Sequence, residues 1–424
     1  MDTPGRSLTS LRSLTLDLPP SCIEFCPAHA DYFIVGTYNL ENPETPDAAA
    51  PPAPGDDEEP PRKEKRIQAR NGSLVVFRLT GSADIRQIRT VSYPSAILDL
   101  HFHPRWAGGK VAAVVSSTGT LSFFHLSVSG EYSATLDEIA THRPLGDDEG
   151  VLILSCCWHP SIPELLAITT SNCQVHILRV DEHWDIHQTH DTPLMTHSLE
   201  AWTVAFSSFV EGHASKSAGE GEEEPQLFTI FSGGDDSKLL SASCAYQRVR
   251  GNIEGNTVRT RWPVAAIQGH EAGVTAILPL GLRLTDGGSL VVTGSYDDHI
   301  RVYSVPSPAQ GASLQRPRVL AEQDLCGGVW RLKLVKLEQE GRGLGEKQQW
   351  TLLILASCMH AGPRVLEVVG DNTGYCRIDI LGRFEEHQSM NYSSDFQPLP
   401  DEGGQRLRCI STSFYDRLLC LWEF

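Results

Sequence analysis

Three histidines of this 424-residue chain each precede an aspartate that lies in a short turn of small residues. The three pairs are His197 with Asp235, His270 with Asp297, and His387 with Asp416. A histidine bonded to a carboxylate is half of a general-base arrangement, in which the imidazole takes a proton from water or a hydroxyl. The same pair is also a common structural element, because a satisfied buried polar network fixes the turns around it. The sequence leaves both interpretations open for each pair.

One turn departs from this pattern. It reads Ser357-Cys-Met-His-Ala-Gly362, which places His360 where the other turns have aspartate, and the preceding loop, 324–328, contains no histidine. A structural pair is therefore missing here, and His360 is the single residue that we favour most as a functional group. Cys358 in the same turn and Cys326 upstream are alternative thiol nucleophiles.

Aromatic residues form a second group of candidates. Trp202, Trp330 and Tyr392 occupy similar positions at the starts of three expected strands. If these starts surround a funnel, the aromatic faces are suited to hold a cation, most favourably a quaternary ammonium. Packing between neighbouring structural units is the alternative use of such amphipathic rings.

The turns belong to a repeat, which indicates the elements that position these residues. Segments 232–240, 293–303 and 412–422 each combine a small-residue turn, an Asp and an alternating strand, and a Gly-His dipeptide precedes one of them. Self-similarity at this spacing is typical of a WD40 β-propeller. Seven blades account for the whole length, so we expect an all-β, seven-bladed propeller that forms a single domain over residues 1–424.

The ring is expected to close through its N-terminal segment. Residues 13–18 alternate between polar and apolar side chains, and we predict that they form the outer strand of the last blade. Closure removes the open sheet edges that would otherwise aggregate.

Three insertions are expected within the blades. Residues 41–70 in blade one are rich in Pro, Ala, Asp and Glu and are predicted to be disordered, because they cannot bury an apolar core. Residues 211–225 form an acidic insertion in blade four, and residues 338–349 form an insertion in blade six.

The amino-acid composition argues against several classes of function. The formal net charge is −18, from 53 acidic and 35 basic residues, which argues against a nucleic-acid partner and favours a cationic one. There is no apolar run long enough to span a membrane and no secretory signal, and the eleven scattered cysteines are typical of reduced thiols. We therefore expect a cytoplasmic monomer with no cofactor, no metal and no membrane contact. Standard enzyme motifs are absent, so a non-catalytic binding scaffold is one open interpretation.

Several motifs together resemble one WD40 family, the diphthine methyltransferases (also called diphthine methylesterases) of diphthamide biosynthesis. They are Gly233-Gly-Asp-Asp236, Thr293-Gly-Ser-Tyr-Asp297, Gly327-Gly-Val-Trp-Arg-Leu-Lys333, Cys358-Met-His-Ala-Gly362 and Ser413-Phe-Tyr-Asp416. The resemblance covers essentially the whole chain. Segment 387–396 departs from it, since the family more usually has Tyr-Gly followed by Asp-Trp there.

The resemblance implies ester hydrolysis. The family removes the methyl ester of methylated diphthine, a modified histidine of translation elongation factor 2, and leaves diphthine and methanol. Diphthine carries a trimethylammonium group, which would suit an aromatic funnel on an acidic protein. The alternative function is a non-catalytic scaffold that binds elongation factor 2 or other enzymes of the pathway. A true methyltransferase is disfavoured, because no Gly-rich loop follows a strand in a context that would hold S-adenosylmethionine.

The resemblance also implies roles for individual residues. His360 would activate water or act as the nucleophile, and the backbone N–H groups near Gly327 and Gly328 would hold the oxyanion. Cys358, Asp416 and His387 remain further catalytic candidates. Substrate-binding candidates are Trp202, Trp330, Tyr392, Gly327, Gly328, Asp235 and Asp297.

Overall fold

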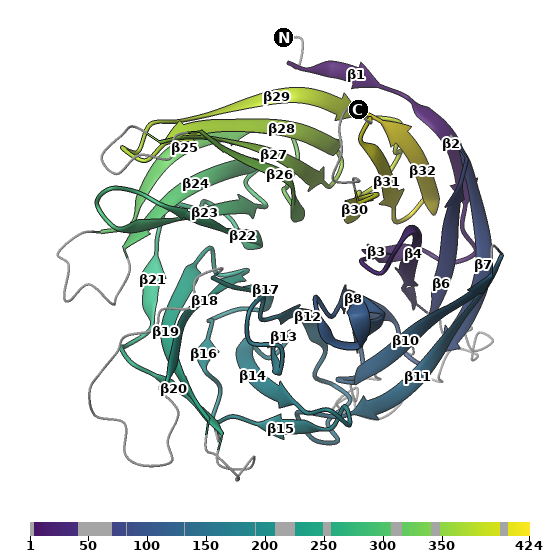
Figure 1. The fold of residues 1–424 in the computed structure, drawn as a ribbon, viewed down its shortest axis with the longest axis horizontal. Coiled ribbons are helices and arrows are strands. Elements are labelled where there is room, and N and C mark those ends of the chain that lie inside the picture. The colour runs from purple at the N-terminus through teal and green to yellow at the C-terminus, as the bar shows by residue number, and fades with distance from the viewer. Residues whose placement is uncertain are drawn as a thin grey trace, which may run out of the picture.

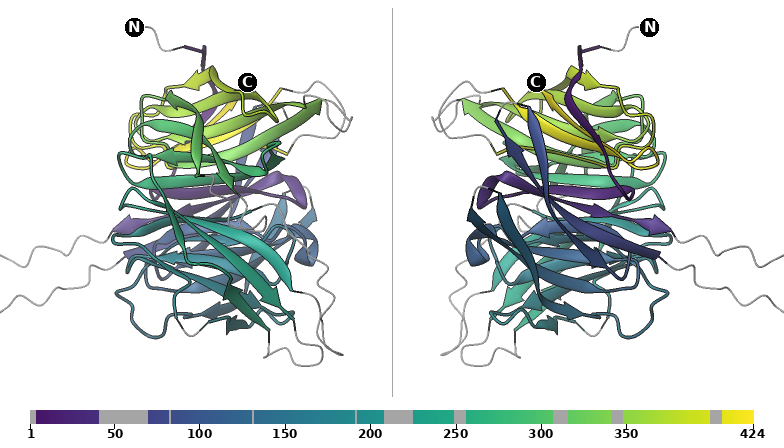
Figure 2. Two further views of the ribbon diagram at one scale, coloured as in Figure 1. Left: turned by 90° about the vertical axis from the view of Figure 1, so that its left-hand side faces the viewer. Right: turned by 90° about the vertical axis from the view of Figure 1, so that its right-hand side faces the viewer.

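The strands of this protein form seven sheets arranged in a ring around a central axis (Figure 1). The computed structural model describes residues 4–40, 70–81, 83–130, 132–190, 192–207, 225–248, 256–306, 316–340, 348–398 and 406–424. Seen from the side, the blades stand next to one another as a single ring (Figure 2). The all-β, seven-bladed propeller predicted from the repeats is thus confirmed.

The innermost strand of each blade lines the centre of the ring. From blade one to blade seven these are β3 (Pro20–Cys26), β8 (Ile97–Phe102), β12 (Ile153–Trp158), β17 (Ala201–Phe206), β22 (Val274–Arg283), β26 (Arg331–Glu340) and β30 (Ser393–Phe396). Their partners complete each sheet outward, and successive blades follow the order of the sequence.

The outer strands are as follows. Blade one adds β4 (His29–Thr37), β5 (Asn39–Leu40), β6 (Arg70–Thr80) and β7 (Asp84–Tyr93); blade two adds β9 (Val111–Ser116), β10 (Leu121–Gly130) and β11 (Ser133–His142); blade three adds β13 (Leu165–Thr170), β14 (Gln174–Val180), β15 (Ile186–Gln188) and β16 (Met195–Thr196). Blade four adds β18 (Gln226–Gly234), β19 (Leu239–Gln247), β20 (Thr257–Thr260) and β21 (Ala265–Ile267); blade five adds β23 (Gly288–Ser295), β24 (His299–Pro306) and β25 (Arg318–Asp324). Blade six adds β27 (Gln349–Cys358), β28 (Gly362–Asp371) and β29 (Cys376–Phe384), and blade seven adds β31 (Arg408–Ser413) and β32 (Leu418–Glu423).

The N-terminal segment closes the ring, as predicted. Strand β2 (Ser10–Thr15) pairs antiparallel with β32, with Leu14 opposite Leu419. The strand begins three residues earlier than the alternating pattern indicated. A preceding strand, β1 (Arg6–Leu8), pairs parallel with β29 of blade six, so the N-terminal segment lies along the outside of two blades (Figure 1). No pattern in the sequence indicated this second contact.

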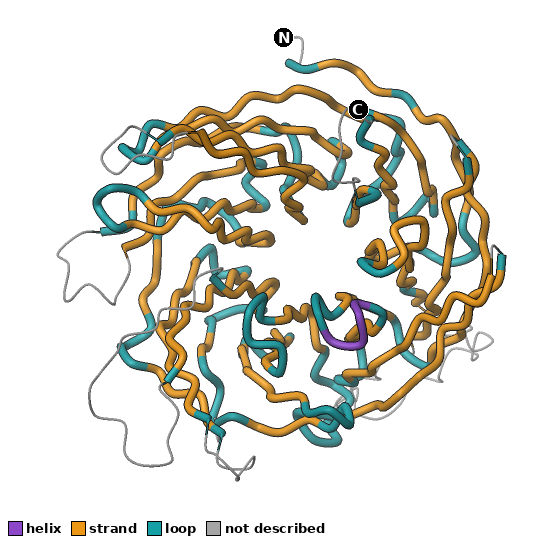
Figure 3. Tube along the Cα trace, viewed as in Figure 1, coloured by secondary structure: helices purple, strands orange, loops and turns teal. Residues whose placement is uncertain are grey.

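Alternating strands bury one side chain in two against the next blade. One cluster joins Val292 of blade five to Ile354 and Leu366 of blade six, and all three are fully buried. Because each blade covers its neighbour in this way, the apolar core is a ring of separate clusters between adjacent blades rather than a central mass. The one helix among the described residues is the short 3-10 turn η1 (Trp106–Gly109), and no described helix is long and apolar enough to cross a membrane (Figure 3).

The expected insertions fall mainly outside the described residues. This holds for residues 41–69 and 211–224, whereas Arg70 already begins β6. In blade six, β26 continues to Glu340 and β27 begins at Gln349. The hairpin therefore extends into the segment 338–349 that we predicted to be an insertion, and only residues 341–347 lie outside the described part.

Candidate functional site

A β-bulge lies near the start of the innermost strand in six of the seven blades. In five of these strands the pairing register shifts at the second residue; the bulged residues are Ser21, Leu98, Leu154, Trp202 and Thr275. Trp330 is bulged in the same way, because its amide donates to the Ser357 carbonyl although Arg331 is the residue opposite Ser357. Bulges re-aim side chains and are common next to binding sites.

The three predicted aromatic residues come together at this end of the ring. The ring centroid of Trp330 lies 5.5 Å from that of Trp202 and 5.1 Å from that of Tyr392. Tyr296 and Phe414 extend the group, with centroids 5.7 Å from Trp330 and 5.6 Å from Tyr392, respectively. All five rings are half-buried. We call these five residues the aromatic arc; it runs from blade four to blade seven.

Sequence reasoning missed two members of the arc, although a signal for them was present. Tyr296 and Phe414 each follow directly after the small residues that end the second strand of a blade, in Gly-Ser-Tyr-Asp and in Ser-Phe-Tyr-Asp. In each motif the Asp, and not the aromatic residue that precedes it, was predicted to belong to the site. Tyr38 continues the arc into blade one, with its ring centroid 5.8 Å from that of Phe414.

Asp235 lies at the edge of the arc rather than in a histidine pair. The Trp202 indole N–H donates to its Oδ1 at 3.1 Å. The carboxylate that His197 contacts is that of the next residue, Asp236, at 2.9 Å from Nδ1, so the predicted pair of His197 with Asp235 was wrong. Asp235 therefore places a carboxylate at the edge of the Trp202 ring, where it adds negative charge to the arc.

The other two predicted histidine–aspartate bonds are also not present. His270 Nε2 bonds the Thr293 hydroxyl at 2.9 Å, and His387 Nε2 bonds the Ser411 hydroxyl at 2.7 Å. The Nδ1 atom of each ring has no partner among the described residues. Burial lowers the pKa of both imidazoles to about 4, so both are neutral near pH 7.

These turns have a structural role. Ser411 also accepts from the buried Trp422 indole N–H at 3.0 Å, which joins turn and strand into one network. Asp416 accepts from the Gln388 amide at 3.0 Å and from the Ser389 hydroxyl at 2.6 Å. Nothing in this arrangement supports His387 or Asp416 as a catalytic residue.

Asp297 is likewise a structural residue. It pairs with the guanidinium of Arg301 at 2.8 Å and accepts from the Glu271 amide at 2.8 Å. Its carboxylate is satisfied inside blade five, away from the arc. This geometry argues against the predicted role of Asp297 in substrate binding.

His360 lies on an exposed turn beside the arc. The turn is closed by a hydrogen bond of 2.7 Å from the Ala361 amide to the Cys358 carbonyl. A second bond, from the Asn391 amide to the Met359 carbonyl at 2.8 Å, ties the turn to the residue before Tyr392. The His360 side chain itself is exposed and has no hydrogen bond or ion pair within the described residues. It is therefore available to a ligand.

Gly327 and Gly328 pack between this turn and the arc. A Cβ on Gly327 would lie 2.6 Å from the Ala361 Cβ, and one on Gly328 would lie 2.7 Å from the Met359 sulfur. Only glycine fits such close approaches. Both glycines are buried beside the His360 turn, and their N–H groups have no acceptor among the described residues.

Cys358 is unsuited to act as a nucleophile. Its side chain is 0% exposed within the core between blades five and six, and burial raises the pKa of the thiol to about 12. A thiol is nucleophilic only when it is ionised and accessible, and this one is neither. The alternative thiol, Cys326, is exposed and has a left-handed backbone with φ 63°.

Six charged side chains inside the channel form a second cluster, which sequence reasoning missed. The residues are Glu24, Asp99, His101, Arg331, Lys333 and Asp395, and we call them the channel network. Arg331 reaches across the channel from blade six to Asp99 in blade two, with Nη2 2.9 Å from Oδ1. The Glu24 carboxylate lies 2.6 Å from His101 Nδ1, and Lys333 Nζ lies 2.9 Å from Asp395 Oδ2.

The network keeps His101 and Asp99 charged, whereas burial raises the pKa of Asp395. Burial alone would lower the pKa of His101, but the carboxylates of Asp99 and Glu24 outweigh burial and raise the pKa to about 10. Burial would raise the pKa of Asp99, and the charges of Arg331 and His101 instead hold it well below its usual range. His101 is therefore a cation near neutral pH, not a free base. No group of three His, Cys, Asp or Glu side chains in the described ranges is placed to hold a metal ion.

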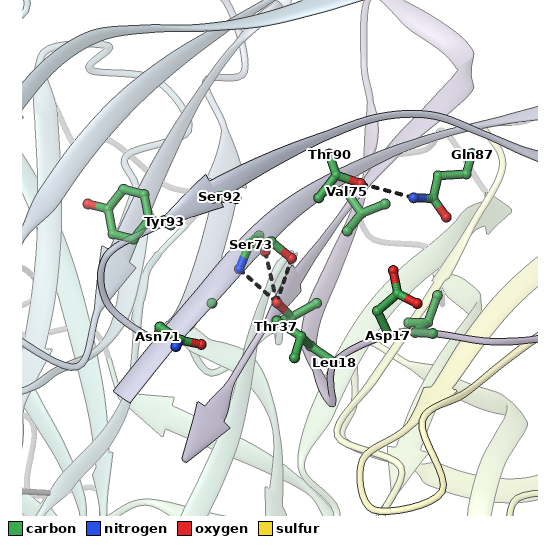
Figure 4. A pocket seen from close by; sticks show the side chains of 12 residues that line it. Asp17, Leu18, Thr37, Asn71, Ser73, Val75, Gln87, Thr90, Ser92 and Tyr93 are labelled. Carbon is green, nitrogen blue, oxygen red and sulfur yellow. Dashed lines mark hydrogen bonds between the residues drawn. The ribbon is translucent and has the colours of Figure 1, made fainter. Parts of the chain in front are cut away.

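A surface pocket of about 350 Å³ lies apart from these groups, on blade one (Figure 4). Its polar walls include Thr37, Ser73, Gln87 and Thr90. These groups satisfy one another, since the Thr37 and Ser73 hydroxyls bond at 2.8 Å and Gln87 donates to Thr90 at 2.9 Å. The pocket contains none of the predicted site residues.

Comparison with known proteins agrees with the motif resemblance. No family profile matches the chain. The chain is 26% identical over 408 residues to the diphthine methyltransferase of Schizosaccharomyces pombe, which covers 96% of this chain and 95% of that protein. It is 25% identical over 378 residues to the diphthine methyltransferase of Homo sapiens, covering 84% of this chain and 68% of that protein.

Among solved structures, Sqt1 from Chaetomium thermophilum has the same fold. It superposes with a TM-score of 0.53 at 14% identity and covers 98% of this chain and 100% of its own. At this identity the likeness concerns the fold alone. The chain is thus a seven-bladed propeller whose sequence is similar to diphthine methyltransferases over most of its length.

Proposed function

We propose that this protein hydrolyses the methyl ester of methylated diphthine on translation elongation factor 2, giving diphthine and methanol. The observation that carries the proposal is the aromatic arc, which places Asp235 and five aromatic rings beside the exposed His360 turn. The names of its relatives place them in the chemistry of diphthine.

The arc supplies the binding half of this reaction. Diphthine carries a trimethylammonium group, and aromatic faces attract such a cation by about 0.5–2 kcal/mol per favourable contact. Asp235 adds a carboxylate at the edge of Trp202. The net charge of −18 further favours approach of a cationic group.

The His360 turn supplies the chemical half. His360 takes a proton from a water molecule, whose oxygen forms a bond to the ester carbonyl carbon. The amides of Gly327 and Gly328 stabilise the negative oxygen of the tetrahedral intermediate. The bond from carbon to the methoxy oxygen then breaks, and the protonated His360 returns its proton to give methanol.

Turnover tests this proposal. The purified protein, at substoichiometric amount, is mixed with elongation factor 2 that carries methyl-esterified diphthine. We expect methanol release and a mass loss of one methylene unit on many substrate molecules per protein. His360→Ala should abolish this turnover, while the exposed control His183→Ala should retain it. Full activity in a folded His360→Ala variant would reassign the base.

Binding without catalysis is the second candidate function. It is favoured by the structure of Chaetomium thermophilum Sqt1 bound to the N-terminus of the ribosomal protein L10, which has the same propeller fold at a TM-score of 0.51. In that case the protein would retain elongation factor 2 on a column but release no methanol.

A cytoplasmic location is part of either proposal. All eleven cysteines are free thiols, as a reducing compartment allows.

A further inference from the structure

The charged residues of the channel lie in two layers below the aromatic arc. Asp99 and Arg331 each directly follow a bulged residue, Leu98 and Trp330. Glu24, His101, Lys333 and Asp395 lie two residues further along their strands. At about 3.3 Å per residue, the Asp99–Arg331 pair forms the first layer under the arc and the other four form a second layer about 7 Å deeper.

The first layer crosses the channel. Arg331 belongs to β26 of blade six and Asp99 to β8 of blade two, and their side chains meet at 2.9 Å. A ligand that enters past the arc therefore meets this ion pair before it can go further. The arc and the pair together make a site with apolar walls and a charged floor.

The two members of the floor differ in how fully they are bonded. Asp99 is 2% exposed, and its Oδ2 also accepts from the Ser155 hydroxyl at 2.9 Å and from the Cys156 amide at 3.2 Å. Arg331 is 19% exposed, and the contact with Asp99 is its only ion pair among the described residues. A guanidinium has five N–H donors, so Arg331 retains donors for a second oxygen ligand.

Two arginines outside the channel are each held by two or more groups. Arg301 pairs with both Asp297 and Glu322, and Arg364 donates to the Ala361 carbonyl and to Glu385. Lys333, in the deeper layer, lies between Asp395 and Glu24. Arg331 is therefore the cation of the channel that is both nearest to the arc and incompletely bonded.

We propose that Arg331 binds the carbonyl or carboxylate oxygen of the ligand whose quaternary ammonium the aromatic arc holds. The site thus selects betaine-like groups, in which a quaternary ammonium and a carboxyl group lie close together. This inference deepens the proposed function, because the diphthine product carries both groups. Arg331 forms a hydrogen bond with the ester and an ion pair with the product, so the product carboxylate gains the stronger contact.

Small ligands test whether the site recognises a carboxyl group, and this test does not require turnover. The full-length protein is titrated by NMR with N,N,N-trimethylglycine, with its methyl ester and with tetramethylammonium. We expect trimethylglycine to bind about tenfold more tightly than tetramethylammonium, as one charge-assisted contact implies. The methyl ester should lie between the two. Equal affinity of wild-type protein for trimethylglycine and tetramethylammonium, or binding of neither, would overturn the inference.

Variants assign the preference to Arg331. The double variant Arg331→Gln/Asp99→Asn removes the ion pair as a unit, so that no buried carboxylate is left unpaired. It should bind both ligands with equal affinity, at the level of tetramethylammonium in the wild type. Arg331→Lys keeps the charge without the planar fork and should show an intermediate preference. Arg318→Gln on the outer surface is the matched control and should behave as the wild type. A tenfold preference that survives in the folded double variant would contradict the assignment.

The outcomes separate this inference from the proposed function. If the preference depends on Arg331 but no methanol is released from elongation factor 2, the betaine site stands and the esterase fails. If methanol is released but the wild type shows no preference for trimethylglycine, the esterase stands and the role of Arg331 is wrong.

Discussion

The histidines of the blade turns and the histidine of the channel have opposite properties. His270 and His387 bond neutral hydroxyls, and burial lowers the pKa of each to about 4. His101 lies between two carboxylates, which overcome burial and raise its pKa to about 10. The turns therefore fix the blades with neutral groups, whereas the channel keeps permanent charge where a ligand enters. A histidine near a carboxylate in sequence is thus no guide to a base in this fold.

The largest expected effect on stability comes from breaking the channel network. Asp99→Ala removes the partner of Arg331, of His101 and of the Ser155 hydroxyl at once. Because Arg331 would lose its ion pair and His101 would keep only Glu24, we expect a loss of about 3 kcal/mol in the free energy of unfolding, measured by urea denaturation. Asp379→Ala, which breaks an exposed pair with Arg377, should leave the midpoint of urea denaturation unchanged. A small loss for Asp99→Ala would mean that the network does not hold the channel together.

Titration sharpens the comparison, because the two regions respond to pH with opposite sign. The neutral turn histidines have folded pKa values below the unfolded value of about 6.5, so their contribution is complete above pH 6.5 and is lost as pH falls towards 4. The loss reaches about 3 kcal/mol for each histidine. His387→Gln should flatten this acid side of the stability profile, measured as unfolding free energy between pH 4 and 8.

The channel histidine should act on the alkaline side. Its folded pKa lies above the unfolded value, so its contribution is complete below pH 6.5 and is lost as pH rises towards 10. The groups that face it are Asp99 and Glu24, which remain ionised over this range. We expect His101→Gln to reduce the decline in stability between pH 7 and 10. An unchanged alkaline profile in that variant would show that His101 is not protonated in the folded state.

A smaller effect is expected at the arc. Trp330 contacts Trp202, Tyr296 and Tyr392, so Trp330→Leu removes the central ring. The affinity for tetramethylammonium should fall by about 1–2 kcal/mol, measured by NMR titration. The exposed Trp262→Leu serves as the control and should bind with the affinity of the wild type. Unchanged binding by Trp330→Leu would show that the arc is a packing cluster.

The smallest effect on stability is expected at His360. Its side chain is exposed and without partners among the described residues, so His360→Ala should change the free energy of unfolding by less than about 0.5 kcal/mol. A larger change, by the same urea measurement, would indicate a structural role for this residue. The same variant is expected to abolish turnover. The two measurements together therefore distinguish a functional role of His360 from a structural one.

The fold was predictable from the sequence because its signals are local. Small-residue turns, alternating strands and the repeat spacing indicated the blades, and the alternation at residues 13–18 indicated ring closure. Trp202, Trp330 and Tyr392 were found because each lies at the start of a strand. His197 bonds Asp236 and not Asp235, because Asp236 lies four residues after Ser232, as Asp297 lies four residues after Thr293; this spacing was present in the sequence and was not used.

The channel network was not predictable in the same way. Four of the seven innermost strands contribute one or two residues each, and their partners lie on strands far away in the sequence, as Arg331 and Asp99 illustrate. Arg331 and Lys333 belong to the Gly327–Lys333 motif, and their alternation along a strand was a signal that went unused. Such a cluster becomes visible only when the ring has been closed.

Ring closure also has a consequence for synthesis on the ribosome. Strand β2 is made almost first, and its partner β32 is made about four hundred residues later. At about 5–20 residues per second, the N-terminal segment waits on the order of 20–80 s without its partner. During this time six blades can form while the face of blade one that packs against blade seven stays uncovered. The growing chain therefore passes through an open-ring stage, in which a chaperone or an early-binding partner would have most to protect.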